Sequence, residues 1–214
     1  MAKEIFDVEC PGCGESFRMD PMEFCDVTDD PDLKARIIEG DFFMNICPEC
    51  GAMVVVEYPI MYIDRNRDLK VYLAPEHEDD LLQQMNSLSI KDQDETEQTE
   101  MRLVSTGVEL MEKILIREAG LDDRLIELYK FLIWDQISEA WPGLAEGDLL
   151  FMFDEEGEYL VVWPSDNGND EKLTAPLDRE FYQELADQYL EFLDVPTGKY
   201  AEVNQAWIGE RFER

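Results

Sequence analysis

Short segments rich in apolar residues predict β-strands in the first third of the chain, and in the first of them, at residues 5–9, apolar and polar residues alternate with the period of two that is typical of strands with one buried face. Residues 5–9 precede the first cysteine pair. Residues 42–46 and 53–58 lie on the two sides of the second pair, and residues 61–64 and 69–73 lie on the two sides of residues 65–68. The polar residues 65–68 separate the last two segments by the length of a hairpin loop. The pattern therefore predicts a small antiparallel sheet.

A helical pattern interrupts these strands. Asp30 is a suitable N-cap, Pro31 fits the first helical position, and Gly40 fits the position just after the last turn. The apolar residues between them fall on one face of a helix: Leu33, Ile37 and Ile38. We expect a short helix over residues 30–39.

Beyond residue 100 the helical period dominates. Residues 101–105 predict a strand, and Thr106 with Glu109 forms a capping box, in which each side chain accepts a hydrogen bond from a backbone amide near the other. The helix that begins there is expected to run to Ala119 and to end at Gly120.

Three further elements are predicted towards the C-terminus. Asp122 or Asp123 can cap a second helix through Trp141, whose apolar residues cover most of its circumference and predict central burial. Residues 149–153 and 159–163 predict a hairpin. A last long helix is expected where apolar residues recur every four positions, at Leu177, Phe181, Leu185, Tyr189 and Leu193.

The charge of the chain excludes two kinds of partner. Its 214 residues include 18 basic and 51 acidic ones, which gives a formal net charge of −33. Nucleic-acid backbones and anionic membrane surfaces both attract basic proteins, so we expect no direct contact with nucleic acid and no membrane contact. A hydrophobic content of 45% is too high for a disordered acidic tail, so the charge must cover a folded protein.

The lengths of the apolar runs indicate the cellular compartment in which we expect the protein. No segment approaches the ~18–20 continuous apolar residues of a membrane span. Residues 1–8 contain no apolar run of the kind found in secretory signals. We therefore expect a cytoplasmic protein, in which cysteines are reduced.

Four of the five cysteines form two copies of the motif Cys-Pro-x-Cys-Gly, at residues 10–14 and 47–51. In each copy proline stiffens the turn, and glycine allows the backbone to close it. Such a turn can direct two thiolates at one ion. Two such turns complete a tetrahedral shell, so we predict a metal site formed by Cys10, Cys13, Cys47 and Cys50. Zinc, with one Zn²⁺ ion per chain, is favoured over iron, although rubredoxin-like iron sites use similar turns.

A shell of four cysteines leaves no coordination position for water or substrate, which favours a structural metal over a catalytic one. Thiol redox chemistry is a weaker alternative, because in disulfide exchange enzymes the Cys-x-x-Cys motif begins a helix. Cys25 belongs to neither motif. We expect it to be a small buried apolar residue; the alternative is a fifth thiol near the site that matters under oxidation.

These patterns together predict an α+β fold. A zinc-ribbon-like antiparallel sheet with an inserted helix occupies residues 1–76, and a mostly helical part with a β-hairpin occupies residues 101–214. Residues 77–100 are an acidic helix or linker, because residues 89–100 are almost wholly polar. The acidic block at residues 76–80 either belongs to that linker or begins a short helix through Leu81, Leu82 and Met85.

The paired motifs resemble those of the CpXC domain, a bacterial and archaeal domain named for them. Two further segments are similar to that family: Asp30-Pro31-Asp32-Leu33-Lys34 with Gly40, and Arg117-Glu118-Ala119-Gly120-Leu121-Asp122-Asp123-Arg124-Leu125-Ile126-Glu127-Leu128. The resemblance covers residues 3–135 and implies that residues 101–135 still belong to the family domain. It also implies metal binding by the four motif cysteines, and it identifies no catalytic residue.

Three other groups have local explanations. His77, the only histidine, lies among carboxylates and could bind a second metal or act as a base, but an exposed linker position accounts for it. Residues 122–124, Asp-Asp-Arg, fit helix capping with a local ion pair better than acidic catalysis. Trp207 fits core packing better than an exposed anchor for a partner.

Three classes of function remain. The preferred one is a structural zinc-binding protein of the cytoplasm that acts as a protein-interaction module or adaptor, in which metal binding supplies folding energy. The second is an acidic nucleic-acid mimic or a transcription-related regulator that binds a basic protein. The third is an enzyme whose site the sequence does not reveal. The sequence defines neither the partner nor the oligomeric state.

Overall fold

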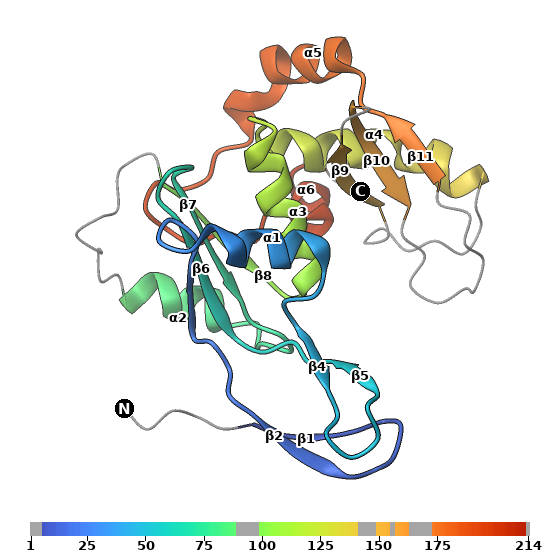
Figure 1. The fold of residues 1–214 in the computed structure, drawn as a ribbon. Helices are drawn as coiled ribbons and strands as arrows, with labels where there is room; N and C mark the ends of the chain where they lie inside the picture. The colour runs from blue at the N-terminus through green and yellow to red at the C-terminus, as the bar shows by residue number, and fades with distance from the viewer. Residues whose placement is uncertain (1–5, 89–98, 141–148, 155–156, 163–172, 213–214) are drawn as a thin grey trace. The chain divides into compact units, whose positions relative to one another are not determined.

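The computed structural model describes residues 6–88, 99–140, 149–154, 157–162 and 173–212. The chain divides into two compact units, Met1–Met111 and Glu112–Arg214, and each is described by itself. Both units contain helices and strands, which confirms the α+β class (Figure 1). Within the described residues, no helix is both long enough and apolar enough to cross a bilayer.

Two antiparallel hairpins lie side by side in the first unit (Figure 1). Strand β1 (Phe6–Glu9) pairs with β2 (Ser16–Met19), and β4 (Met44–Ile46) pairs with β5 (Met53–Val55). Strands β1, β4 and β5 lie within the segments predicted as strands. Strand β2 was not predicted, although the turn that precedes it holds the first cysteine motif.

A four-stranded sheet with the order β3-β6-β7-β8 forms the core of this unit. Its strands are β3 (Phe24–Asp26), β6 (Ile60–Asp64), β7 (Leu69–Leu73) and β8 (Glu100–Val104). The predicted hairpin is confirmed as the antiparallel pair β6–β7, whereas β3–β6 and β7–β8 are parallel. One face of the sheet is fully buried along the row Cys25, Tyr62 and Val71.

The parallel partner β8 begins at the end of the predicted linker. Residues 89–98 lie outside the described residues, so the division of the chain at residues 77–100 stays a prediction. The pairing of β7 with β8 nevertheless joins the segments on the two sides of that linker in one sheet.

The predicted helix between the two cysteine motifs is confirmed as α1 (Pro31–Glu39). Gly40 ends it in the left-handed region, with φ 80°, and its N–H donates to the carbonyl of Ile37. Asp30 precedes the helix, but its side chain makes no capping hydrogen bond. The short helix α2 (Leu81–Leu88) follows the acidic block rather than beginning in it.

The capping box predicted for the next helix, α3 (Gly107–Glu118), is confirmed. The N–H of Glu109 donates to Oγ1 of Thr106 at 3.1 Å, and the N–H of Thr106 donates to Oε2 of Glu109 at 3.2 Å. Gly120 follows the helix with φ 68°, a conformation that glycine adopts without steric cost.

The predicted second helix is confirmed as α4 (Asp123–Ala140), and the backbone N–H of Arg124 donates to the Asp122 side chain at 3.0 Å. Every residue from Leu125 to Lys130 is buried, but Leu132 is exposed. The prediction of burial all round the helix therefore holds only for its first half.

A three-stranded antiparallel sheet with the order β11-β10-β9 belongs to the same unit. The predicted hairpin is confirmed as β9 (Leu149–Asp154) and β10 (Gly157–Val162). The third strand, β11 (Leu173–Pro176), was not predicted.

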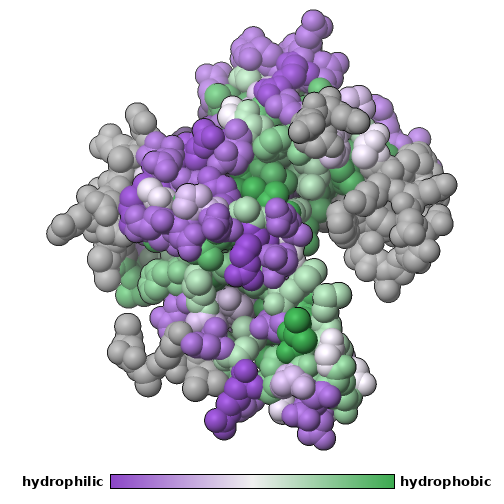
Figure 2. All heavy atoms as spheres, viewed as in Figure 1, coloured by the Kyte–Doolittle hydropathy of each residue, from purple (hydrophilic) through white to green (hydrophobic). Residues whose placement is uncertain are grey.

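The last predicted helix is shorter than expected, because α5 spans Arg179–Tyr189 and a 3₁₀ turn, η2, spans Leu190–Phe192. Asp178 caps α5 by accepting hydrogen bonds from the N–H groups of the second and third helical residues. A further helix, α6 (Gln205–Phe212), was not predicted. Figure 2 shows hydrophilic side chains over the visible face of α5, as its many acidic residues require.

Candidate metal centre

The two cysteine motifs form the turns of the two hairpins, one between β1 and β2 and the other between β4 and β5. Both turns have the same hydrogen bonds. The N–H of the first cysteine donates to the carbonyl five residues later, at 3.0 Å and 2.9 Å, and the N–H of the following glycine donates back to the first cysteine, at 2.8 Å and 2.9 Å. These glycines, Gly14 and Gly51, have φ 76° and 73°. The repeated sequence is therefore a repeated structure.

The structure brings the four predicted metal ligands, Cys10, Cys13, Cys47 and Cys50, together, with all four Sγ atoms within 4.8 Å of one another. The Sγ atoms of Cys10 and Cys50 are 3.7 Å apart, and those of Cys13 and Cys47 are 3.8 Å apart. Four sulfurs bound to one zinc ion at about 2.3 Å lie roughly 3.8 Å apart at the corners of a tetrahedron. The cluster could hold a metal ion, and it is the one such group of metal-ligating side chains among the described residues.

Backbone hydrogen bonds, burial and neighbouring thiols shift the pKa values of the thiols in this cluster in opposite directions. The backbone N–H of Gly12 lowers the pKa of Cys10 to about 7, even though burial opposes it. At Cys13 the N–H of Glu15 acts in the same direction, but burial and the neighbouring thiols raise the pKa to about 12. Four sulfurs this close cannot all lose their protons unless a cation compensates their charge. A divalent metal ion supplies that compensation.

The surroundings of the cluster are apolar but small. Cys10 and Cys47 are buried, whereas Cys13 and Cys50 are exposed. Val54 packs against the two buried cysteines, and half-buried apolar residues from both hairpins complete the contact: Val8, Phe17, Ala52 and Val56. A core of this size contributes little to holding two hairpins together, so a metal ion bound by both would add stability.

Cys25 lies on β3, outside this cluster, and it is fully buried in the sheet. Burial, together with the carboxylates of Asp30 and Asp26, raises the pKa of its thiol to about 12. The expectation of a small buried residue is confirmed.

The other residues considered for chemistry have local partners. A ring nitrogen of His77, Nδ1, lies 2.8 Å from the carbonyl oxygen of Ala74. Arg124 and Asp122 form the expected ion pair, with 2.6 Å between Nη2 and Oδ2. Trp207 is half-buried on α6, and the guanidinium of Arg211 lies 3.8 Å from the centroid of its ring.

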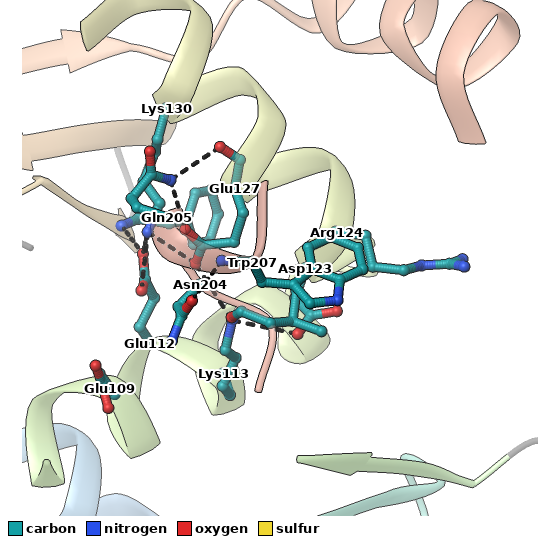
Figure 3. A network of polar contacts seen from close by, with 12 residues as sticks. Glu109, Glu112, Lys113, Asp123, Arg124, Glu127, Lys130, Asn204, Gln205 and Trp207 are labelled. Atoms are coloured by element: carbon teal, nitrogen blue, oxygen red, sulfur yellow. Dashed lines mark hydrogen bonds and ion pairs between the residues drawn. The ribbon is translucent and has the colours of Figure 1, made fainter. Parts of the chain in front are cut away.

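A second cluster of titratable groups, not expected from the sequence, is buried in the second unit (Figure 3). It consists of charged residues from α3 and α4: Glu112, Lys113, Asp123, Glu127 and Lys130. The sequence analysis assigned these residues no buried role, because their partners are distant in the chain. The signal that could have found them is that they occur among apolar residues at positions otherwise typical of a buried helix face.

The contacts of this cluster join several elements. The ammonium of Lys130 lies 3.0 Å from Oε1 of Glu112 and 2.9 Å from Oε1 of Glu127. Lys113 donates to the carbonyl of Val203 at 2.6 Å, and Glu112 accepts from the N–H of Phe151 at 2.6 Å. No buried side-chain nitrogen or oxygen in the described part of the chain lacks a hydrogen-bond partner. The cluster is therefore a satisfied structural network that fixes β9 and the segment before α6 to the helices.

Burial and the neighbouring charges of this network shift the pKa values of its members in opposite directions. Burial acts to raise the pKa of Glu127, but the ammonium groups of Lys130 and Lys113 outweigh it and lower that pKa. At Glu112, burial outweighs the attraction of Lys130 and raises the pKa. Burial acts to lower the pKa of Lys130, yet the carboxylates of Glu112 and Glu127 raise it. Lys130 thus remains charged because the carboxylates replace its hydration.

Comparison with protein families shows that residues 8–130 match the model of the family described as CpXC protein. The match includes all four clustered cysteines and the five charged residues of the second cluster, and it spans more than half of the chain. Comparisons with curated proteins and with solved structures gave no match.

Proposed function

The chain belongs to the CpXC family, and from that premise we propose that it is a zinc-stabilised protein-interaction module, an adaptor in which the metal has a structural role. The observation that carries the proposal is the convergence of four Sγ atoms from two hairpins, with separations of 3.7 Å and 3.8 Å between the closest described pairs. These separations fit a tetrahedral zinc ion. Zinc is favoured over iron because it is the usual ion of structural sites with four cysteines.

A structural role follows from the number of ligands. Cys10, Cys13, Cys47 and Cys50 would occupy all four positions of the zinc ion, which leaves none for a substrate or a reactive water. The ion would also join two hairpins whose shared apolar contact is small. Binding free energy at such a site is folding free energy, so the metal would hold the hairpins in one arrangement.

The charge supports a protein as the partner. Four thiolates and one zinc ion bring a net charge of −2 to a chain that already carries −33. Direct binding of a nucleic-acid backbone is therefore disfavoured even though many zinc ribbons serve that purpose. The five cysteines are free of disulfide bonds, which fits the reducing conditions of the cytoplasm.

Metal analysis of cysteine variants tests the structural metal. The purified protein should contain one zinc ion per chain, and Cys13→Ser should lose it because three thiolates hold zinc far more weakly than four. Cys25→Ala is the matched control, since it removes a cysteine outside the cluster and should retain the zinc. After removal of zinc by a chelator, backbone NMR signals of the two hairpins should lose their dispersion. Hairpins that stay folded without metal would contradict the structural role.

A further inference from the structure

The two hairpins share one fold but differ in the chemistry of their outer faces. On β1 and β2 every exposed side chain is polar: Asp7, Glu9, Ser16 and Arg18. On β4 and β5 every exposed side chain is apolar, with exposed fractions of 44% for Met44, 71% for Ile46, 73% for Met53 and 62% for Val55. Green, hydrophobic atoms accordingly gather over β4 and β5 in Figure 2.

The four apolar side chains form one continuous face. Met44 is directly opposite Val55 in the strand pair, and Ile46 is directly opposite Met53. Val54, which lies between Met53 and Val55 in β5, points to the other side of the hairpin and packs against Cys10 and Cys47. Exposed cross-strand neighbours of this kind are a surface patch rather than isolated apolar residues.

The fold does not require this face to be apolar. The first hairpin has the same turn and the same hydrogen bonds, and its outer face is polar. The hairpin itself therefore does not require apolar residues on this face of β4 and β5. Contiguous exposed apolar side chains of this kind mark a protein interaction surface.

Negative charge borders this face. Residues 44–55, which form the hairpin, contain one acidic residue, Glu49, and no lysine or arginine. Glu49 is exposed in the turn between the two strands, and Glu57 follows Val55 by two positions. The four thiolates with zinc, as proposed above, add a further −2 beside the turn.

We propose that the outer face of β4 and β5, made of Met44, Ile46, Met53 and Val55, docks a segment of a partner protein in which lysine or arginine flanks apolar side chains. The proposal rests on the adaptor function proposed above and names the surface and the chemistry of the partner. Apolar side chains of the partner cover the patch, and its basic side chains pair with the acidic border. A second copy of this chain is a poor occupant because it brings a second acidic border to the first.

Peptide selection on the full-length, zinc-loaded protein tests the surface. Peptides selected from a random display library should combine apolar residues with lysine or arginine, and their affinity, measured by fluorescence anisotropy, should fall as salt rises. The double variant Ile46→Ser with Met53→Ser should weaken their binding about tenfold or more, as removal of central apolar anchors does. Both serines preserve the net charge, and the equivalent position Ser16 shows that serine is compatible with such a hairpin.

The matched control is Leu88→Ser with Phe192→Ser, which removes two apolar side chains of similar exposure, 73% and 64%, from other elements. It should leave the affinity unchanged, and both double variants should retain one zinc ion per chain. Selected peptides that bind the Ile46 and Met53 double variant as tightly as the wild type would overturn this surface while leaving the adaptor function in place.

Two other outcomes would also overturn the proposal. Acidic or uncharged selected peptides would contradict the chemistry assigned to the partner. Self-association of the wild type in sedimentation, lost in the Ile46 and Met53 double variant, would identify a second copy as the occupant. Failure to select any peptide would count against the surface and the adaptor function together, whereas the zinc content would still test the structural metal separately.

Discussion

At the scale of single residues, the five cysteines illustrate how position determines chemistry. Four of them follow strands in tight turns, where backbone N–H groups and neighbouring thiols act on each sulfur. Cys25 lies on the edge strand β3 and is fully buried, and burial and the carboxylates of Asp30 and Asp26 raise the pKa of its thiol to about 12. A thiol with so high a pKa is protonated near neutral pH and reacts slowly.

Cys13 has an equally high pKa but is exposed, and Cys10 is buried but has a lowered pKa, whereas Cys25 combines full burial with a raised pKa. Cys25 should therefore be the least reactive cysteine of the folded protein. At pH 8 an alkylating reagent should modify the four clustered cysteines once zinc is removed, but it should modify Cys25 only after the sheet unfolds. Mass spectrometry of digested protein locates the modified residues. Rapid labelling of Cys25 in the folded chain would contradict its burial and its raised pKa.

The sequence allowed the cysteine cluster to be predicted residue by residue because the spacing within each motif is local. It did not reveal the buried charges of Lys113 and Lys130, because their burial depends on partners distant in the chain. Lys113 contacts the carbonyl of Val203, and Glu112, which neutralises Lys130, also binds the N–H of Phe151. No local pattern records such contacts.

At the scale of elements, the same contrast between local signals and distant contacts explains why helix ends were predictable and some short strands were not. Local signals mark several helix ends: terminal glycines follow α1 and α3, and capping residues begin α3 and α4, so these ends were predictable. Strands β3 and β11 have three and four residues, and each is defined by pairing with another strand. Strands β4 and β5 are as short as β3, but the cysteine motif between them is a local signal that β3 and β11 lack.

The N-cap of α5 offers a test at this scale. Asp178 accepts hydrogen bonds from the N–H groups of Glu180 at 2.9 Å and Phe181 at 3.1 Å. Asp178→Ala should lower the free energy of unfolding by about 1 kcal/mol, because both N–H groups lose their partner. Glu184→Ala, an acidic residue exposed on the same helix, should have little effect in the same urea titration. Equal stability of the two variants would argue against the cap.

The buried network offers a second test, because Lys130 compensates two buried carboxylates. Lys130→Met should lower the free energy of unfolding by about 3–5 kcal/mol, as expected when one partner of a buried ion pair is removed. The exposed Lys199→Met is the control and should change stability by less than about 0.5 kcal/mol.

A double variant isolates the interaction of Lys130 with Glu112. Adding Glu112→Gln to Lys130→Met should cost less than the sum of the two single changes, because it removes a carboxylate that the first change left unpaired. Thermal unfolding of the four proteins measures this coupling. Additive losses would show that the two side chains do not stabilise each other.

At the scale of the whole molecule, charge and metal have to be considered together. A net charge of −33 opposes a compact fold through self-repulsion, although it keeps the protein soluble. The four thiolates increase that repulsion unless a cation neutralises part of it. A zinc ion in the cluster would thus hold the hairpins together and limit the charge at the point where negative groups lie closest.

X-ray absorption at the zinc edge of the purified full-length protein tests this central claim most directly. The account predicts one zinc ion per chain with four sulfur neighbours at about 2.3 Å and no nitrogen or oxygen neighbour. A shell that includes water or a carboxylate, an iron spectrum in place of zinc, or a protein that is folded and free of metal would contradict it.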